Sequence, residues 1–294
     1  MHVHVLYRTH AGSNSKPRPS WFDRRTAWES LCASLAQVPD VTVTAVVDGS
    51  LPPELVAPLR SVEQVTVRGG QASSSFRRAL TLAGQLADRA PEDTLFWLAE
   101  DDYLYRPEAM SSLLAAAAAV PSADYLTLHT PDDAAWHATH PSQPDPQPPS
   151  LAGGPVQAGS ATWQRIGKTT STFGVRAAAL REDRWLMDLG SRVGAPFDMA
   201  TWHALQGWQP FPWAHVLDDV DRTPGLRGSA KVVAKPVMRS VLNVVSRRVA
   251  RERVLLAPTE DLAVHMELAQ VTDDAAWATL ARDTATDAGR PAAS

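Results

Sequence analysis

The sequence of 294 residues contains a single cysteine, Cys32, which excludes an intrachain disulfide and a zinc site built from cysteines. It also lacks any run near the roughly 18 apolar residues that a membrane-spanning helix needs. Its first residues, MHVHVLYR, are too short and too polar for a signal peptide. Excess basic charge is absent as well, because the net charge is −4. These absences predict a cytoplasmic protein that does not bind nucleic acid through its overall charge.

The composition, with 44% hydrophobic and 20% charged residues, is that of an ordinary globular protein. Strand-like segments alternate with helix-like segments through the first half of the chain, and this alternation predicts an α/β fold with a mainly parallel central sheet flanked by helices. The expected strands cover residues 2–7, 41–47, 62–68, 94–99 and 124–130. Helical periodicity begins near Ser20, and a further helix is expected from Pro107.

Acidic and glycine residues stand where several of these strands end. Asp48 follows the second strand, Gly69-Gly70 the third, and Glu100-Asp101-Asp102 the fourth. Because ligands of such sheets bind beyond the carboxyl ends of the strands, these positions are candidates for one site. Three adjacent carboxylates repel one another, and a divalent cation would relieve that repulsion. The alternative is that the triplet caps the helix expected from Pro107.

The ordered set Tyr7-Arg8-Thr9, Asp48-Gly49, Gly69-Gly70 with Arg77-Arg78, and FWLAEDDY resembles the GT-A glycosyltransferases of the family-2 type, which carry a D-x-D motif. The resemblance covers residues 1–130. It implies a GT-A, Rossmann-like fold that uses a nucleoside-diphosphate sugar and Mn²⁺ or Mg²⁺. Glu100 stands where the family has the first Asp, and the Gln-x-x-Arg-Trp signature of processive members is absent.

A closer similarity is to a group of bacterial glycosyltransferase-like proteins that share EDDY, a Trp followed by Thr-Ser-Thr, and a late His-x-Glu. Trp163, Thr170-Ser171-Thr172 and His265-Met266-Glu267 fit that outline. The two resemblances together imply a non-processive, inverting transferase acting on a hydroxyl acceptor. The implied metal ligands are Glu100, Asp102 and His265, the nucleotide contacts Arg8, Thr9, Asp48, Arg78 and Asp101, the catalytic carboxylates Asp198 and Glu267, and the acceptor contact Trp163.

Asp198 and His265 could instead have purely structural roles. Asp198 follows Gly194-Ala195-Pro196 and would serve equally well as the cap of a helix. His265 and Glu267 lie two apart on an expected strand, so their side chains share one face, although a histidine near the end of a chain is more often structural.

The second half of the chain is expected to bind the acceptor. Residues 131–160 form a Pro-rich loop with His137 and His140, which are either metal ligands or solvated, and the acceptor half covers 161–283 before a flexible tail at 284–294. In the basic segment 227–253, eight basic residues face one acidic residue, Glu252. This segment is interpreted as a clamp over phosphate, as a peripheral contact with an anionic membrane surface, or as a solvated helix face.

Two other functions fit the same residues. A metal-dependent nucleotidyltransferase would need basic residues on the triphosphate near the first loop, where Lys16 and Arg18 are the candidates. A non-catalytic relative that binds a sugar or a partner would keep the fold without the chemistry.

Overall fold

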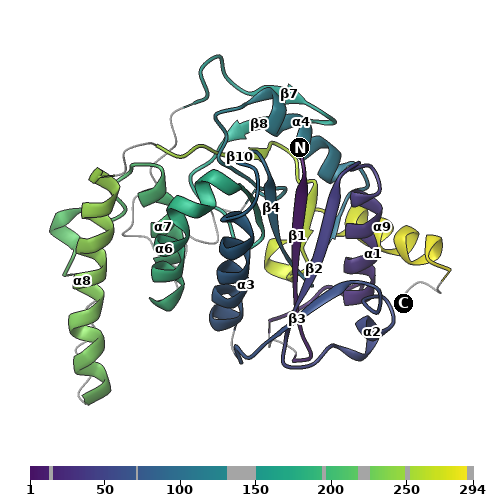
Figure 1. Cartoon of the computed structure of the whole chain (residues 1–294), viewed down its shortest axis with the longest axis horizontal. Coiled ribbons are helices and arrows are strands. Elements are labelled where there is room, and N and C mark those ends of the chain that lie inside the picture. The colour runs from purple at the N-terminus through teal and green to yellow at the C-terminus, as the bar shows by residue number, and fades with distance from the viewer. Residues whose placement is uncertain are drawn as a thin grey trace.

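The computed structural model describes residues 1–12, 16–70, 72–130, 150–193, 197–217, 226–248 and 252–289. Helices pack on both sides of a central sheet, as Figure 1 shows. The strands are β1 (Val3–His10), β2 (Val41–Asp48), β3 (Glu63–Val67), β4 (Leu95–Glu100), β5 (Tyr103–Tyr105), β6 (Tyr125–Leu126), β7 (Val156–Ala158), β8 (Ala161–Arg165), β9 (Phe173–Arg176), β10 (Leu255–Pro258) and β11 (Ala263–His265). The α-helices are α1 (Arg24–Leu35), α2 (Pro53–Val56), α3 (Ala72–Ala87), α4 (Ala109–Ala119), α6 (Ala177–Val193), α7 (Phe197–Leu205), α8 (Leu226–Arg248) and α9 (Asp274–Asp287).

The large sheet has the strand order β3-β2-β1-β4-β9-β6-β10-β8-β7. The strands β1 to β4 are parallel, β9 runs against β4, and β6 and β10 return to the direction of β4. Toward the far edge β8 is again reversed, and the edge strand β7 pairs antiparallel with β8. The predicted α/β class, with a mainly parallel, Rossmann-like central sheet flanked by helices, is therefore confirmed.

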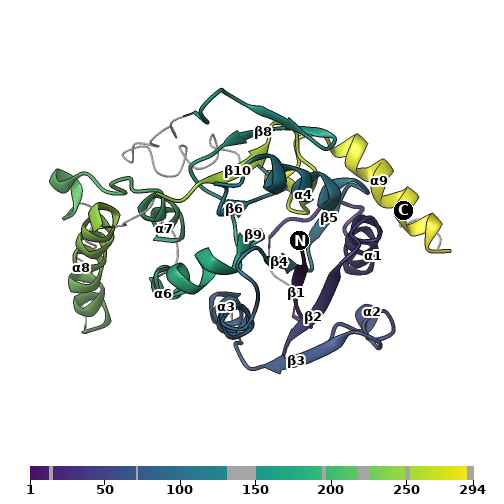
Figure 2. The same cartoon turned by 45° about the horizontal axis from the view of Figure 1, so that its top comes forward.

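The two faces of the sheet are covered by different helices, and Figure 2 shows α1 on one side and α3 with α6 on the other. Alternate residues of β1 explain this arrangement, because neighbouring side chains of a strand point to opposite faces. Val5 and Tyr7 pack with α1 and α4, whereas Leu6 packs with α3 and α6. Each face of the sheet therefore has its own hydrophobic core.

A second sheet of two strands, β5 and β11, joins the end of β4 to the C-terminal part of the chain. Its antiparallel register places His265 beside Tyr103. Behind it, Val264 and Met266 pack with Trp21 and Trp277, and Trp277 belongs to α9. Both figures place α9 next to α1. This small sheet brings the late His-x-Glu segment to the acidic triplet.

Several boundaries differ from the predicted ones. The first helix begins at Arg24 rather than near Ser20, because the carboxylate of Asp23 accepts hydrogen bonds from the amides of Arg25 and Thr26. The predicted strand 124–130 is β only at Tyr125–Leu126. Residues 284–287, expected in a flexible tail, form the last turn of α9.

Among the described residues, no helix combines the length and the apolar character required to cross a membrane. Residues 131–149 of the expected Pro-rich loop, with His137 and His140, lie outside the described residues. The part of that loop from residue 150 onward includes β7, which pairs with β8.

Candidate functional site

The site lies at the carboxyl ends of three neighbouring parallel strands. In the register of the sheet, Arg8 of β1 faces Glu100 of β4, and His10 of β1 faces Asp48 of β2. The strand order therefore brings the acidic triplet close to Asp48, as expected for a ligand site of an α/β sheet.

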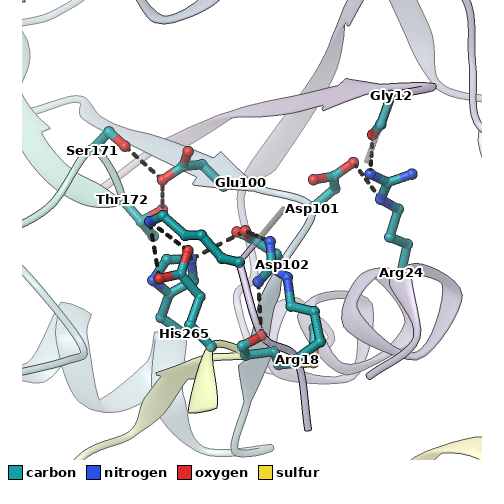
Figure 3. A network of polar contacts seen from close by, with 12 residues as sticks. Gly12, Arg18, Arg24, Glu100, Asp101, Asp102, Ser171, Thr172 and His265 are labelled. Atoms are coloured by element: carbon teal, nitrogen blue, oxygen red, sulfur yellow. Dashed lines mark hydrogen bonds and ion pairs between the residues drawn. The ribbon is translucent and has the colours of Figure 1, made fainter. Parts of the chain in front are cut away.

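The three carboxylates of Glu100, Asp101 and Asp102 point in three different directions, as Figure 3 shows. Glu100 is directed toward Ser171 and Thr172, Asp101 toward Arg24, and Asp102 toward Arg18 and His265. The chain turns between β4 and β5 at this point, and the turn separates the three side chains. The triplet is therefore three individual sites rather than one cluster of equivalent ligands.

Glu100 is bound by groups that hold it in place. Its Oε1 atom pairs with the guanidinium of Arg8, and its Oε2 atom accepts hydrogen bonds from Ser171 Oγ at 2.6 Å and Thr172 Oγ1 at 3.1 Å. Arg8 is itself buried and donates to the carbonyl of Ala72 at the start of α3. Both oxygens of Glu100 are thus engaged by the protein, and so is Arg8, the expected nucleotide contact.

Asp101 is buried against the N-terminal segment. Its Oδ2 atom accepts a hydrogen bond from Thr9 Oγ1 at 2.6 Å and lies 3.3 Å from Arg24 Nε. Burial, followed by the neighbouring charge of Asp102, raises the pKa of Asp101. Thr9 has no exposed surface. In this structure the expected nucleotide contacts Thr9 and Asp101 therefore bind each other.

Asp102, His265 and Glu267 form a compact cluster, with one ligand-type atom from each within 4.8 Å of the others. Asp102 Oδ2 lies 3.0 Å from His265 Nε2, and this nitrogen lies 3.2 Å from Glu267 Oε1. The imidazole of His265 stacks on Tyr103, with ring centroids 4.8 Å apart and planes inclined by 3°. The stacking and the two carboxylates fix the orientation of the ring.

The donor set of this cluster suits a divalent cation. Carboxylate oxygens with one imidazole nitrogen match the preferences of Mn²⁺, and carboxylates match those of Mg²⁺. Asp102 Oδ1 is buried and receives no hydrogen bond from the part of the chain that the structure describes. A buried carboxylate oxygen without a partner is costly unless a ligand satisfies it, so the three residues fit a metal ion. Glu100, the third expected ligand, is not in this group.

The electrostatics of the cluster are those of paired charges. Burial opposes ionisation of Asp102, but the hydrogen bond from His265 and the contact with Arg18 outweigh it, so the pKa of Asp102 is lowered. Burial likewise opposes the charge on His265, and its hydrogen bond to Asp102 with the nearby charge of Glu267 raises the pKa of His265. The charged forms of both groups therefore favour each other.

Each of four carboxylates at the site is matched by a cation from the N-terminal segment. The pairs are Glu100 with Arg8, Asp101 with Arg24, Asp102 with Arg18 at 2.8 Å, and Glu267 with Lys16 at 2.7 Å. Lys16 and Arg18 come from the first loop, and Arg24 is the first residue of α1. Sequence reasoning did not find Arg24, because nothing in the local pattern distinguishes it from an ordinary helix residue.

Asp48 organises the loop that follows β3. Its carboxylate accepts hydrogen bonds from the amide of Gly69 at 2.7 Å and from that of Gly70 at 3.1 Å. A Cβ atom on Gly69 would lie 2.6 Å from the backbone nitrogen of Ser75, so only glycine fits there without movement. Asp48 and the Gly-Gly turn, predicted as parts of one site, are in direct contact.

Among the described contacts, none joins Arg78 or Trp163 to the acidic residues of the site. Arg78 is exposed on α3, and no described contact links it to the acidic residues. Trp163 is fully buried in the core, where its indole nitrogen donates to the carbonyl of Ala158, so its side chain is closed to an acceptor. Asp198 lies in the first turn of α7, but its side chain is outside the described residues.

Two residues of the basic segment 227–253 have structural roles. Arg253 is buried and pairs with Asp183 at 2.7 Å and Asp124 at 3.4 Å. Arg239 is buried too and donates to the carbonyl of Val216. These two arginines are therefore not available to a phosphate or a membrane surface. The interpretations of the segment as a phosphate clamp and as a membrane contact both stay predictions.

Comparisons with known proteins identify no sequence family, since no family pattern and no curated protein match the chain. Among solved structures it is similar to a 4-diphosphocytidyl-2C-methyl-D-erythritol synthase, at 11% identity and TM-score 0.39 over 81% of this chain and 97% of that one. It is similar to a CMP:2-keto-3-deoxy-manno-octonic acid synthetase complexed with CTP, at 11% identity and TM-score 0.39 over 98% and 100%. Mouse xyloside xylosyltransferase 1 is similar at 11% identity and TM-score 0.34 over 62% and 69%. Each similarity is weak, so function is inferred from the side chains of this chain.

Proposed function

We propose that the chain is a metal-dependent, non-processive glycosyltransferase that moves a sugar from a nucleoside-diphosphate sugar to an acceptor hydroxyl. The observation that carries this proposal is the convergence of Asp102, His265 and Glu267 at the carboxyl ends of the parallel strands, with a buried oxygen of Asp102 that has no hydrogen-bond partner among the described residues. The Gly69-Gly70 turn held by Asp48 lies at the same end of the sheet. Such an end is where α/β sheets bind nucleotides.

The residues have distinct roles in this proposal. Asp102, His265 and Glu267 would hold Mn²⁺ or Mg²⁺, and a bound cation would stabilise the negative charge that develops on the leaving diphosphate. Arg8, Ser171 and Thr172 fix Glu100, which keeps the end of β4 in place. Asp48 orients the loop that would contact the nucleotide.

The transfer itself makes one bond and breaks one. The acceptor oxygen bonds to the anomeric carbon of the sugar while the bond from that carbon to the diphosphate oxygen breaks, and the diphosphate leaves with the electron pair. The proton of the acceptor hydroxyl passes to a carboxylate base, for which Asp198 is the candidate from the sequence. Displacement from the opposite side inverts the anomeric centre.

Nucleotidyl transfer is the second candidate, and one observation favours it. That chemistry requires basic side chains near the first loop, and both Lys16 and Arg18 lie against the acidic cluster. The two reactions differ in their products. Glycosyl transfer releases a nucleoside diphosphate, whereas nucleotidyl transfer from a triphosphate releases pyrophosphate.

Ligand-dependent thermal stability tests the metal and nucleotide site. We expect one family among UDP-, GDP-, CDP- and TDP-sugars to raise the melting temperature when Mn²⁺ is present, because a ligand that binds only the folded state stabilises it by mass action. At a ligand concentration 100 times the Kd, the gain in unfolding free energy is about 2.7 kcal/mol. Asp102→Asn should abolish this gain.

Asp88→Asn is the matched control, because Asp88 forms an exposed ion pair with Arg184 on the surface of the chain. It should retain the full ligand effect. If folded wild-type protein responds to no nucleotide, the transferase proposal is wrong and a non-catalytic relative becomes the better interpretation. Release of a nucleoside diphosphate from the stabilising nucleotide sugar, against release of pyrophosphate from the nucleoside triphosphate of the same base, then separates the two reactions.

A further inference from the structure

We propose that Lys16 is an internal counter-ion of the acidic site, which leaves Glu267 and pairs with phosphate oxygens when a metal ion and a diphosphate bind together. This inference rests on the proposed function, since it requires such a ligand at Asp102, His265 and Glu267. It assigns to Lys16 the coupling between metal binding and nucleotide binding.

The first line of support is the position of the ammonium group. Lys16 Nζ lies 2.7 Å from Glu267 Oε1 and 2.9 Å from Glu267 Oε2. The carboxylate of Glu267 is 10% exposed, and its Oε1 is the atom that also faces His265. A cation that uses Glu267 as a ligand must therefore compete with the charge of Lys16 for the same oxygens.

The second line of support is that Lys16 differs from the other three cations of the site. Its side chain is 59% exposed, whereas those of Arg8, Arg18 and Arg24 are largely buried. A lysine ammonium on a flexible, exposed stem can change partner at low cost. Lys16 is thus the exchangeable cation of the four.

The third line of support is the balance of charge. Two carboxylates, Asp102 and Glu267, already face Arg18 and Lys16, and both also contact His265. A divalent ion added alone would bring excess positive charge into contact with the ammonium group. A diphosphate that arrives with the ion restores the balance and offers Lys16 new oxygens. Binding of the metal and of the diphosphate should therefore be positively coupled.

Lys16→Gln separates the two effects that the proposal combines. Without nucleotide, removal of the competing charge should tighten Mn²⁺ binding by about three- to tenfold, the scale of a partly exposed ion pair. In the same variant, the factor by which Mn²⁺ improves the affinity for a nucleoside diphosphate should fall by about fivefold or more. Lys16→Arg keeps the charge and should restore most of the coupling.

Electron paramagnetic resonance of free Mn²⁺ measures the first affinity, and quenching of tryptophan fluorescence by UDP, GDP, CDP and TDP with and without Mn²⁺ measures the second. Arg25→Gln is the control for loss of a charge, because the side chain of Arg25 pairs with Glu29 within α1 and not with a carboxylate of the site. It should leave both values unchanged.

Two results would overturn the inference in distinguishable ways. If Lys16→Gln binds Mn²⁺ and the diphosphate as wild type does, Lys16 has no part in the coupling, and the metal site itself stands. If no protein binds Mn²⁺ with or without any of the four diphosphates, the metal site of the proposed function is wrong and the inference fails with it.

Discussion

Replacement of Arg253 by Met should be among the most destabilising single substitutions in this protein. Arg253 is 3% exposed and joins Asp183 at 2.7 Å to Asp124 at 3.4 Å. Asp183 also accepts a hydrogen bond of 2.6 Å from Tyr125 Oη. Methionine fills a similar volume but removes the positive charge that both buried carboxylates face. Breaking a buried ion pair in this way costs about 3–5 kcal/mol.

The magnitude can be checked by thermal and urea unfolding at pH 7. At about 2 °C per kcal/mol for a chain of this size, the melting temperature should fall by about 6–10 °C. Asp183→Asn in the Arg253→Met background removes the buried negative charge that lost its partner, and it should recover part of the lost unfolding free energy. Arg247→Met is the control, because Arg247 is exposed and hydrogen-bonded to Gln209, and it should change stability by under about 0.5 kcal/mol. Equal effects of Arg253→Met and Arg247→Met would refute the account of the buried network.

Two further predictions concern other parts of the molecule. Gly69→Ala should weaken the nucleotide-dependent gain in melting temperature more than Gly49→Ala does. A Cβ atom at Gly69 would collide with Ser75, whereas a Cβ atom at Gly49 meets nothing within 4 Å and is strained only by the backbone φ of +78°. Equal ligand responses in the two variants would contradict the role given to the loop. Burial, followed by the nearby charge of His2, lowers the pKa of His4, so the folded state favours the neutral imidazole. The resulting contribution to the unfolding free energy is fully present above the ordinary histidine pKa of about 6.5, and it is lost as the pH falls through the lowered pKa of the folded state. His4→Gln should therefore lose less unfolding free energy than wild type between pH 7.5 and pH 5.5 in urea titrations, and an identical loss would count against the assignment.

Much of the fold follows from local patterns in the sequence. The β-branched run at 41–47 becomes β2, which is buried from Thr44 to Val47, and the apolar run at 94–99 becomes β4, which is buried from Leu95 to Ala99. Alternation of strands and helices was enough to indicate a parallel sheet. The fifth expected strand shows where such patterns end. Thr127 still donates its amide to Leu256 of β10, but its Oγ1 bonds to the backbone of His129, and this local contact takes the place of a longer strand ladder.

The sequence predicted where the candidate site lies, but it did not predict which basic side chain pairs with each carboxylate. Strand ends and a resemblance placed Asp48, Glu100, Asp102, His265 and Glu267 in one region, and the structure brings Asp102, His265 and Glu267 into contact. The partners of the individual carboxylates depend on contacts between distant parts of the chain, such as Arg24 with Asp101. No local propensity encodes a choice of that kind. The resemblance also suggested Trp163 as an acceptor contact, although its neighbours on β8 and β10 bury it.

The wide separation of these residues along the chain has a consequence for the order in which the protein matures. During synthesis Asp102 emerges long before His265 and Glu267, and the strand that carries His265 is secured only when Trp277 of α9 packs behind it. Every strand of the large sheet precedes that step in the chain. The candidate metal cluster of Asp102, His265 and Glu267 should therefore be completed last, after the sheet has formed. During synthesis, the large sheet would form before Asp102, His265 and Glu267 come into contact.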